Sequence, residues 1–204
     1  MNGITPATAL WYVSRATGVV ALLMLTAVML LGVGVNRQGR LPGLPRFAVT
    51  GLHRNLSLLA VAFVAAHVLS AVADSYVTIP LTAAVVPFSS PYQRLWLGVG
   101  AVSLDLMIAV TVTSLLRPYL GRTLWRGVHW LAYALWPAAV AHSIGSSTDM
   151  RHGVLLDVVL GCIAAVAAAV AWRLVAAARA LPRAQRVGVL MTDRPGRVPV
   201  RGGS

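Results

Sequence analysis

The sequence has no lysine, no glutamate and only one cysteine, Cys162. A single cysteine excludes an intramolecular disulfide and an iron–sulfur cluster held by four thiolates, and we expect it to be a small core residue. Charged residues make up only 11% of the chain, whereas 58% is hydrophobic and the mean hydropathy is +0.77. This composition excludes an ordinary soluble domain and indicates a membrane protein with several spans.

The few charges are unbalanced, because the chain has 17 arginines and only five acidic residues, all of them aspartate. A formal net charge of +12 can indicate nucleic-acid binding. Here, however, the arginines lie mainly in the connections between apolar runs and in the C-terminal tail. Membrane topology explains them better, so we expect contact with membrane lipid and no nucleic-acid partner.

Five apolar runs are each long enough to cross about 30 Å of hydrocarbon as a helix. The first run lacks a basic leading region and a small-residue cleavage site, so we interpret it as a retained span rather than a signal peptide. The sequence therefore predicts an all-α integral membrane bundle of five transmembrane helices. The runs cover residues 8–35, 47–73, 95–116, 124–145 and 153–180.

Two segments outside these runs differ in composition. Residues 75–93 are apolar but interrupted by three prolines, which favours an ordered external loop or a re-entrant cap over another span. Residues 181–204 are basic and rich in proline and glycine, and this composition predicts a disordered cytoplasmic tail. The chain thus divides into a membrane domain, residues 1–180, and a tail, residues 181–204.

The arginines also predict the orientation in the membrane. Fourteen of the 17 fall around the first and third connections and in the tail, whereas Arg15, Arg94 and Arg151 fall on the other side. The positive-inside rule then places the N-terminus outside and the C-terminus in the cytoplasm. We expect a multi-pass protein of the plasma membrane.

Four histidines lie within the apolar runs. His53 and His67 are 14 residues apart on the second run, and His129 and His142 are 13 apart on the fourth, which runs in the same direction. These spacings correspond to about 21 and about 19.5 Å of helix, so the histidines fall at two matched depths. Two imidazoles facing each other suit iron, and without a free axial position they suit electron transfer. A straight helix would turn the ring 13 residues on by about 140°, although a kink at Pro137 offers a way to re-aim it.

The segments WYVSRATGVVALL, LHRNLSLLAVAFVAAH and RGVHWLAYALWPAAVAHSIGSSTD resemble bacterial, stand-alone members of the ferric reductase-like transmembrane domain family. That superfamily also includes NADPH oxidases and the haem-binding subunit of a periplasmic methionine-sulfoxide reductase system. The resemblance implies two b-type haems stacked across the membrane, the inner one held by His53 and His129 and the outer one by His67 and His142. It also implies electron flow from a cytoplasmic flavin or nicotinamide donor to an outer acceptor.

The sequence departs from the larger family members, which carry a flavin- and NADPH-binding domain after their spans. These 204 residues contain no glycine-rich dinucleotide fingerprint. We therefore expect a separate cytoplasmic flavin reductase to supply electrons. On this interpretation the chain is an oxidoreductase component with no catalytic residues of its own.

Three arginines near the histidines are candidates for binding the haem propionates, because a guanidinium pairs with carboxylates through a planar fork. Arg54 and Arg126 lie near the inner level, where ordinary topology signalling explains them equally well. Arg15 lies inside the first run, and we expect it to neutralise the outer propionates rather than only to reach the headgroups. Asp157 is expected to pair with Arg15 or Arg151.

The sequence thus predicts a b-type cytochrome that moves electrons across the membrane to an extracytoplasmic acceptor, such as a ferric chelate, oxygen or a partner protein. The alternative is a haem-binding structural or assembly subunit without turnover of its own. A small-solute transporter fits poorly, since discontinuous helices and a polar site at mid-membrane are not evident.

Overall fold

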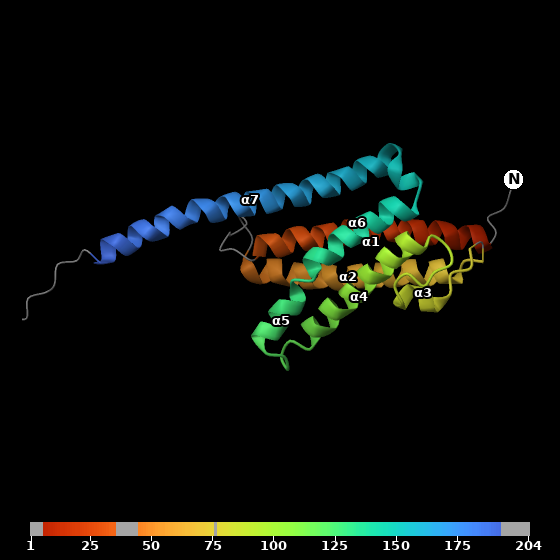
Figure 1. The fold of residues 1–204 in the computed structure, drawn as a ribbon, viewed down its shortest axis with the longest axis horizontal. Helices are drawn as coiled ribbons and strands as arrows, with labels where there is room; N and C mark the ends of the chain where they lie inside the picture. Colours follow the sequence, from red (N-terminus) through yellow and green to blue (C-terminus); the bar gives the residue numbers. More distant parts are fainter. Residues whose placement is uncertain (1–5, 36–44, 76, 193–204) are drawn as a thin grey trace, which may run out of the picture.

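The structure is a computed structural model that describes residues 6–35, 45–75 and 77–192. All regular secondary structure in this part of the chain is helical, which confirms the all-α class. Figure 1 shows the elements in chain order: α1 (Pro6–Val35), α2 (Arg46–Ala73), α3 (Leu81–Val85), α4 (Arg94–Leu115), α5 (Arg122–His129), α6 (Ala132–Ser146), the 3-10 turn η1 (Asp149–Arg151) and α7 (Gly153–Thr192).

Four of these helices are long and apolar enough to cross a membrane. Much of their surface is apolar and exposed, with Leu69 on α2 at 62% and Leu160 on α7 at 52%. Extended apolar exposure of this kind is suited to lipid rather than to water. The chain is therefore a multi-pass membrane protein. The candidate spans are Ala9–Gly34, Phe47–Ala73, Arg94–Leu115 and Gly153–Arg179.

The predicted span at 124–145 is two helices instead of one. The helix is interrupted between α5 and α6 at Trp130 and Leu131. There the amides of Leu131 and Tyr133 donate hydrogen bonds to the carbonyls three residues earlier in the chain. With 15 residues, α6 is about 22 Å long and too short to cross the membrane alone, so five spanning helices are not reached in the described residues. Figure 1 shows α5 and α6 following one another alongside α4.

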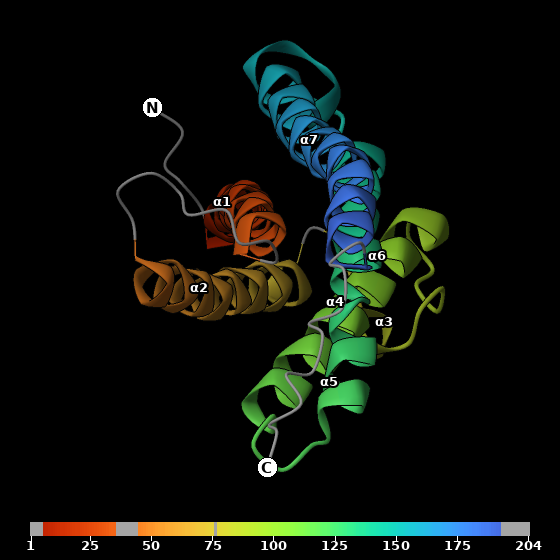
Figure 2. The same cartoon turned by 90° about the vertical axis from the view of Figure 1, so that its left-hand side faces the viewer.

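The helices pack as two antiparallel pairs. α1 packs along α2, α4 packs along α6, and α1 also contacts α6 and α7. Figure 2, which looks along the bundle, shows α1 and α2 on one side and α4 to α6 on the other. The α4–α6 pair is joined by the Ser103 hydroxyl, which donates to the Leu135 carbonyl at 3.3 Å.

The tightest core lies where α1, α6 and α7 meet. Cys162 is buried there, as expected of a small core residue. Trp136 of α6 is also buried, and its Nε1 donates to the Thr26 hydroxyl of α1 at 3.0 Å. Apolar packing and one satisfied polar contact thus hold α6 against α1. The other members of this core are Leu22, Val140, Met150, Val159 and Val166.

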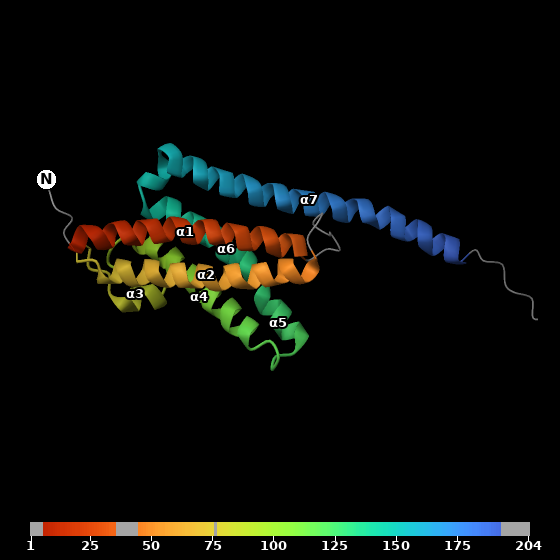
Figure 3. The ribbon, with the colours of Figure 1, turned by 180° about the vertical axis from the view of Figure 1, so that it is seen from behind.

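A cap covers one end of the bundle. It includes the short helix α3, which packs against α4 and lies beside the end of α2 in Figure 3. The cap turns at Phe88 and Gln93, which have positive φ angles of 61° and 41°. The Phe88 ring fills the space where a side chain at Gly98 would stand, which anchors the cap on α4. Residues 77–93 thus form an ordered cap.

Helix α7 extends well past the bundle, as Figure 1 shows. Its 40 residues correspond to about 60 Å. The helix continues through residues 181–192, the first part of the predicted tail. Residues 193–204 of the predicted tail lie outside the described residues.

Candidate functional site

The four histidines of the apolar runs form two pairs between the helix pairs. His67 of α2 and His142 of α6 lie near the cap with their ring centres 6.2 Å apart; we refer to them as the cap-side pair. His53 of α2 and His129 of α5 have ring centres 6.4 Å apart, and we refer to them as the α5-side pair. The ring planes are inclined by 74° and 64° respectively.

These separations match the geometry of a metal ion held between two imidazoles. A metal–imidazole nitrogen bond of about 2.0–2.1 Å on each side places the two ring centres about 6.3 Å apart. The 13-residue spacing between His129 of α5 and His142 of α6 does not turn His142 away, because the helix is interrupted at Trp130–Leu131 between them. The break alters the rotation that a continuous helix would impose.

Backbone carbonyls orient the cap-side rings. His67 Nδ1 lies 2.7 Å from the Ser14 carbonyl oxygen of α1, and His142 Nδ1 lies 2.8 Å from the Trp96 carbonyl oxygen of α4. Since a carbonyl only accepts, each Nδ1 must carry the hydrogen. The Nε2 atom of each ring then keeps its lone pair. A neutral imidazole in this tautomer can bind a metal through Nε2.

The α5-side rings have no such hydrogen bonds. The Nδ1 atoms of His53 and His129 are buried and have no hydrogen-bond partner in the described part of the chain. The Val28 carbonyl of α1 lies beside His53 but outside hydrogen-bond geometry. His129 instead stacks on Trp125, with ring centres 5.1 Å apart and an interplanar angle of 25°. The two levels therefore hold their histidines in different ways.

A cavity of about 450 Å³ lies at the cap-side level. His67 and His142 both line it, together with apolar side chains of α1, α2 and α4 and part of the cap. Cavities of this size hold ligands as large as cofactors, and apolar walls with few polar groups are typical of them. The cap-side pair thus faces a space that can hold more than a bare metal ion.

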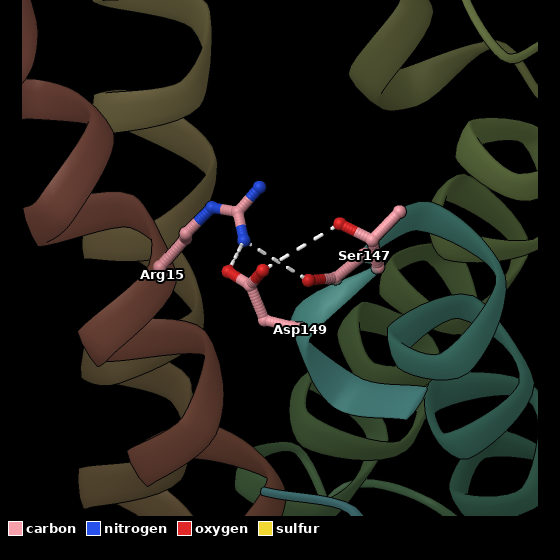
Figure 4. A network of polar contacts seen from close by, with 4 residues as sticks. Arg15, Ser147 and Asp149 are labelled. Atoms are coloured by element: carbon pink, nitrogen blue, oxygen red, sulfur yellow. Dashed lines mark hydrogen bonds and ion pairs between the residues drawn. The ribbon is translucent and has the colours of Figure 1, made fainter. Parts of the chain in front are cut away.

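Arg15 also lines this cavity, where it is held by η1 and its neighbours. Its guanidinium forms an ion pair with Asp149 and donates to the Ser147 hydroxyl at 3.2 Å, as Figure 4 shows. It also lies 4.0 Å from the centre of the Trp11 ring. The expected pairing with Asp157 is wrong, because Asp149 takes that position and Asp157 is exposed.

The two arginines predicted for the other level are placed differently. Arg54 and Arg126 are both exposed, and neither lines the cap-side cavity. Arg117, which the sequence places among the topology arginines, lies 4.4 Å from the centre of the Trp125 ring, on which His129 stacks. Arg117 is thus the arginine connected to the α5-side pair through an aromatic ring. Only the folded chain reveals this, since Arg117 lies in the turn after α4 and His129 at the end of α5.

Three further ionisable residues lie outside the two histidine pairs. Asp105 of α4 is half-buried and forms no ion pair or hydrogen bond with the described residues. The Arg151 side chain donates to the carbonyls of Ile144 at 2.9 Å and Gly145 at 3.2 Å, so it closes the end of α6. His152 is exposed. None of the three joins a histidine pair.

A protein-family model described as a ferric reductase like transmembrane component matches residues 17–140. The match covers more than half of the chain and includes His53, His67 and His129, and it ends two residues before His142. No curated protein and no solved structure matches the chain. Multi-pass apolar helices and the family match lead to one conclusion: the chain belongs to the ferric reductase-like transmembrane family.

Proposed function

We propose that this protein is a b-type cytochrome that transfers electrons across the plasma membrane through two haems. The cap-side pair would hold one haem and the α5-side pair the other. The observation that carries the proposal is the ring-centre separation of 6.2 Å in one pair and 6.4 Å in the other. Both values agree with about 6.3 Å for two imidazoles on opposite sides of one metal ion.

The donor set fits haem better than a bare metal ion. Within the described residues, no group of three or more metal-binding side chains gathers, so each pair would contribute two ligands. Haem would require only two protein ligands, and the cap-side cavity has the apolar walls that a macrocycle requires. The Nδ1–H groups of His67 and His142 also leave Nε2 free to bind iron.

The residues of the chain would hold the cofactor and control its surroundings. Bound haem supplies an iron that gains and loses one electron. Two histidine ligands for each iron would favour electron transfer over oxygen binding. Arg15 would place a positive charge near the propionates at the cap-side level, where it already lines the cavity. Arg54 and Arg126 are weaker candidates for that role, since both side chains are exposed.

The direction of transfer follows from the arginine distribution. Fourteen of 17 arginines favour the side of the first connection and the tail, so we propose that this side is cytoplasmic and that the cap is outside. Electrons would then enter at the α5-side pair from a separate cytoplasmic flavin reductase. They would leave at the cap-side pair to an extracytoplasmic acceptor or partner protein. Lipid surrounds the apolar helices.

The test is haem stoichiometry followed by vectorial transfer. Purified protein should contain about two haems per chain, with the absorption spectrum of a low-spin b-type cytochrome that a chemical reductant changes reversibly. In sealed vesicles carrying a reductant inside, an impermeant acceptor outside should reoxidise the haems of correctly oriented protein. Vesicles prepared without the protein are the control.

The possible outcomes distinguish an electron-transferring cytochrome from a structural subunit and from a protein that binds no haem. Protein without haem refutes the cytochrome proposal and favours a different use of the histidine pairs. Protein with haem that the outer acceptor never reoxidises refutes electron transfer and favours the structural or assembly subunit. Loss of the transfer signal in the His67→Ala variant would link it to the cap-side pair.

A further inference from the structure

Two glycines stand directly against the cap-side histidines. A Cβ atom at Gly18 of α1 would lie 2.9 Å from His67 Nδ1, and one at Gly100 of α4 would lie 2.6 Å from His142 Nδ1. Carbon and nitrogen atoms that are not bonded do not approach this closely without repulsion. Each imidazole therefore occupies the space that any side chain larger than hydrogen would need.

The same arrangement occurs on two helices that are unrelated in sequence. The carbonyl that accepts from the imidazole belongs to the residue four positions before the glycine: Ser14 before Gly18, and Trp96 before Gly100. In an α-helix these two residues are joined by a backbone hydrogen bond and lie on the same face. Each ring thus rests on a single helical turn, and the missing side chain lets its Nδ1 reach the carbonyl.

The α5-side level has a looser version of this arrangement. Val28 and Gly32 follow Ser14 and Gly18 by 14 residues, the spacing that separates His53 from His67 on the antiparallel helix α2. A Cβ atom at Gly32 would lie 3.5 Å from the His53 ring, which is ordinary van der Waals contact.

His129 departs further from the pattern. It rests on Trp125 rather than on a glycine turn, and its Nδ1 has no partner within the described residues. The close glycine contact combined with a hydrogen bond to a carbonyl is therefore a feature of the cap-side pair. The two levels differ in how firmly their rings are oriented.

We propose that Gly18 and Gly100 are positioning residues of the cap-side haem site. By admitting the imidazoles onto the Ser14 and Trp96 carbonyls, they hold the hydrogen on Nδ1 and direct Nε2 toward the iron. The inference rests on the proposed haem function and adds to it that the two sites are not equivalent. The cap-side site is built for fixed ligand orientation, and the α5-side site is not.

A consequence for the reduction potential follows. An Nδ1–H group that donates to a carbonyl makes the imidazole a stronger electron donor to the metal. Stronger donation stabilises the ferric state more than the ferrous state. Displacing His67 or His142 from its carbonyl should therefore raise the potential of the cap-side haem.

The experiment compares Gly18→Ala and Gly100→Ala with Gly161→Ala. Gly161 also lies within a membrane span, in α7, but a Cβ atom there would meet nothing within 4 Å. Alanine favours a helix more than glycine does, so a weaker helix cannot explain a defect. Circular dichroism and gel filtration in detergent check folding. Haem content, the electron paramagnetic resonance of the low-spin ferric state and a redox titration are then measured.

Gly18→Ala and Gly100→Ala should change the resonance of one haem and raise its midpoint potential, or lose that haem, while the other haem keeps its wild-type values. Gly161→Ala should match the wild type. If Gly100→Ala fails to fold, Gly18→Ala decides, since its overlap is smaller. Variants that keep wild-type resonances and potentials overturn the positioning role. A wild-type protein without haem instead refutes the proposed function, so the two failures are distinct.

Discussion

Removing one histidine of the cap-side pair should remove one haem and leave the other. The ring centres of His67 and His142 are 6.2 Å apart, so a single iron between them depends on both. The α5-side pair lies about 21 Å away along α2, because 14 residues separate His53 from His67. Replacing His67 or His142 with alanine therefore removes no direct contact of the α5-side pair.

The expected stoichiometry follows from this separation. The haem content of each single variant, His67→Ala and His142→Ala, should be about one per chain instead of about two. The double variant should also retain about one haem, because both changes damage the same site and their effects cannot add. Combining His67→Ala with His53→Ala should instead remove both haems, since the two changes lie at different levels.

The assay is haem quantified per purified chain, with the spectrum of the remaining haem recorded in both redox states. His152→Ala is the matched control, because this histidine is exposed and belongs to neither pair. Two haems retained in His142→Ala would refute the cap-side pairing. A single haem in the His67→Ala, His53→Ala variant would refute the two-level assignment.

Three further predictions concern the surroundings of the histidines. Arg15→Ala should keep both haems but lower the potential of the cap-side one, because a nearby positive charge favours the ferrous state; an unchanged redox titration would mean that Arg15 only pairs with Asp149. Thr26→Val should lower the free energy of unfolding in detergent by about 1–3 kcal/mol, because it leaves the buried Trp136 N–H without an acceptor. Thr26→Ser keeps the hydroxyl and should have a free energy of unfolding near that of the wild type. A reporter active only in the cytoplasm should work when fused after Arg201 and stay silent when fused within residues 81–92; the reverse pattern would invert the proposed orientation.

The sequence alone was sufficient to predict the membrane class, the helical fold and the two depths of the histidines. Hydrophobic length determines whether a segment can span a bilayer, and 14 residues of helix correspond to one axial distance whatever surrounds them. Spacing therefore predicted that His67 and His142 share a depth. The helical class and the membrane location are now confirmed, and the role of the four histidines as haem ligands stays a prediction.

Direction around a helix axis required the folded chain. A straight helix would turn His142 about 140° from His129, and the sequence suggested Pro137 as the kink that re-aims it. The helix is instead interrupted at Trp130–Leu131, and Pro137 lies within α6. Such a break depends on local backbone hydrogen bonds, which no periodic pattern of apolar residues specifies. The same break divides the predicted span at 124–145 into α5 and α6.

Partnerships between distant side chains also depended on packing. Arg15 pairs with Asp149, 134 residues later, rather than with Asp157, and Arg117 meets the Trp125 ring. Gly18 reads in the sequence as one small residue among many, and only the approach of α2 places His67 over it. Axial position is encoded locally by counting residues, whereas lateral contact is decided by which helices pack together and at what rotation.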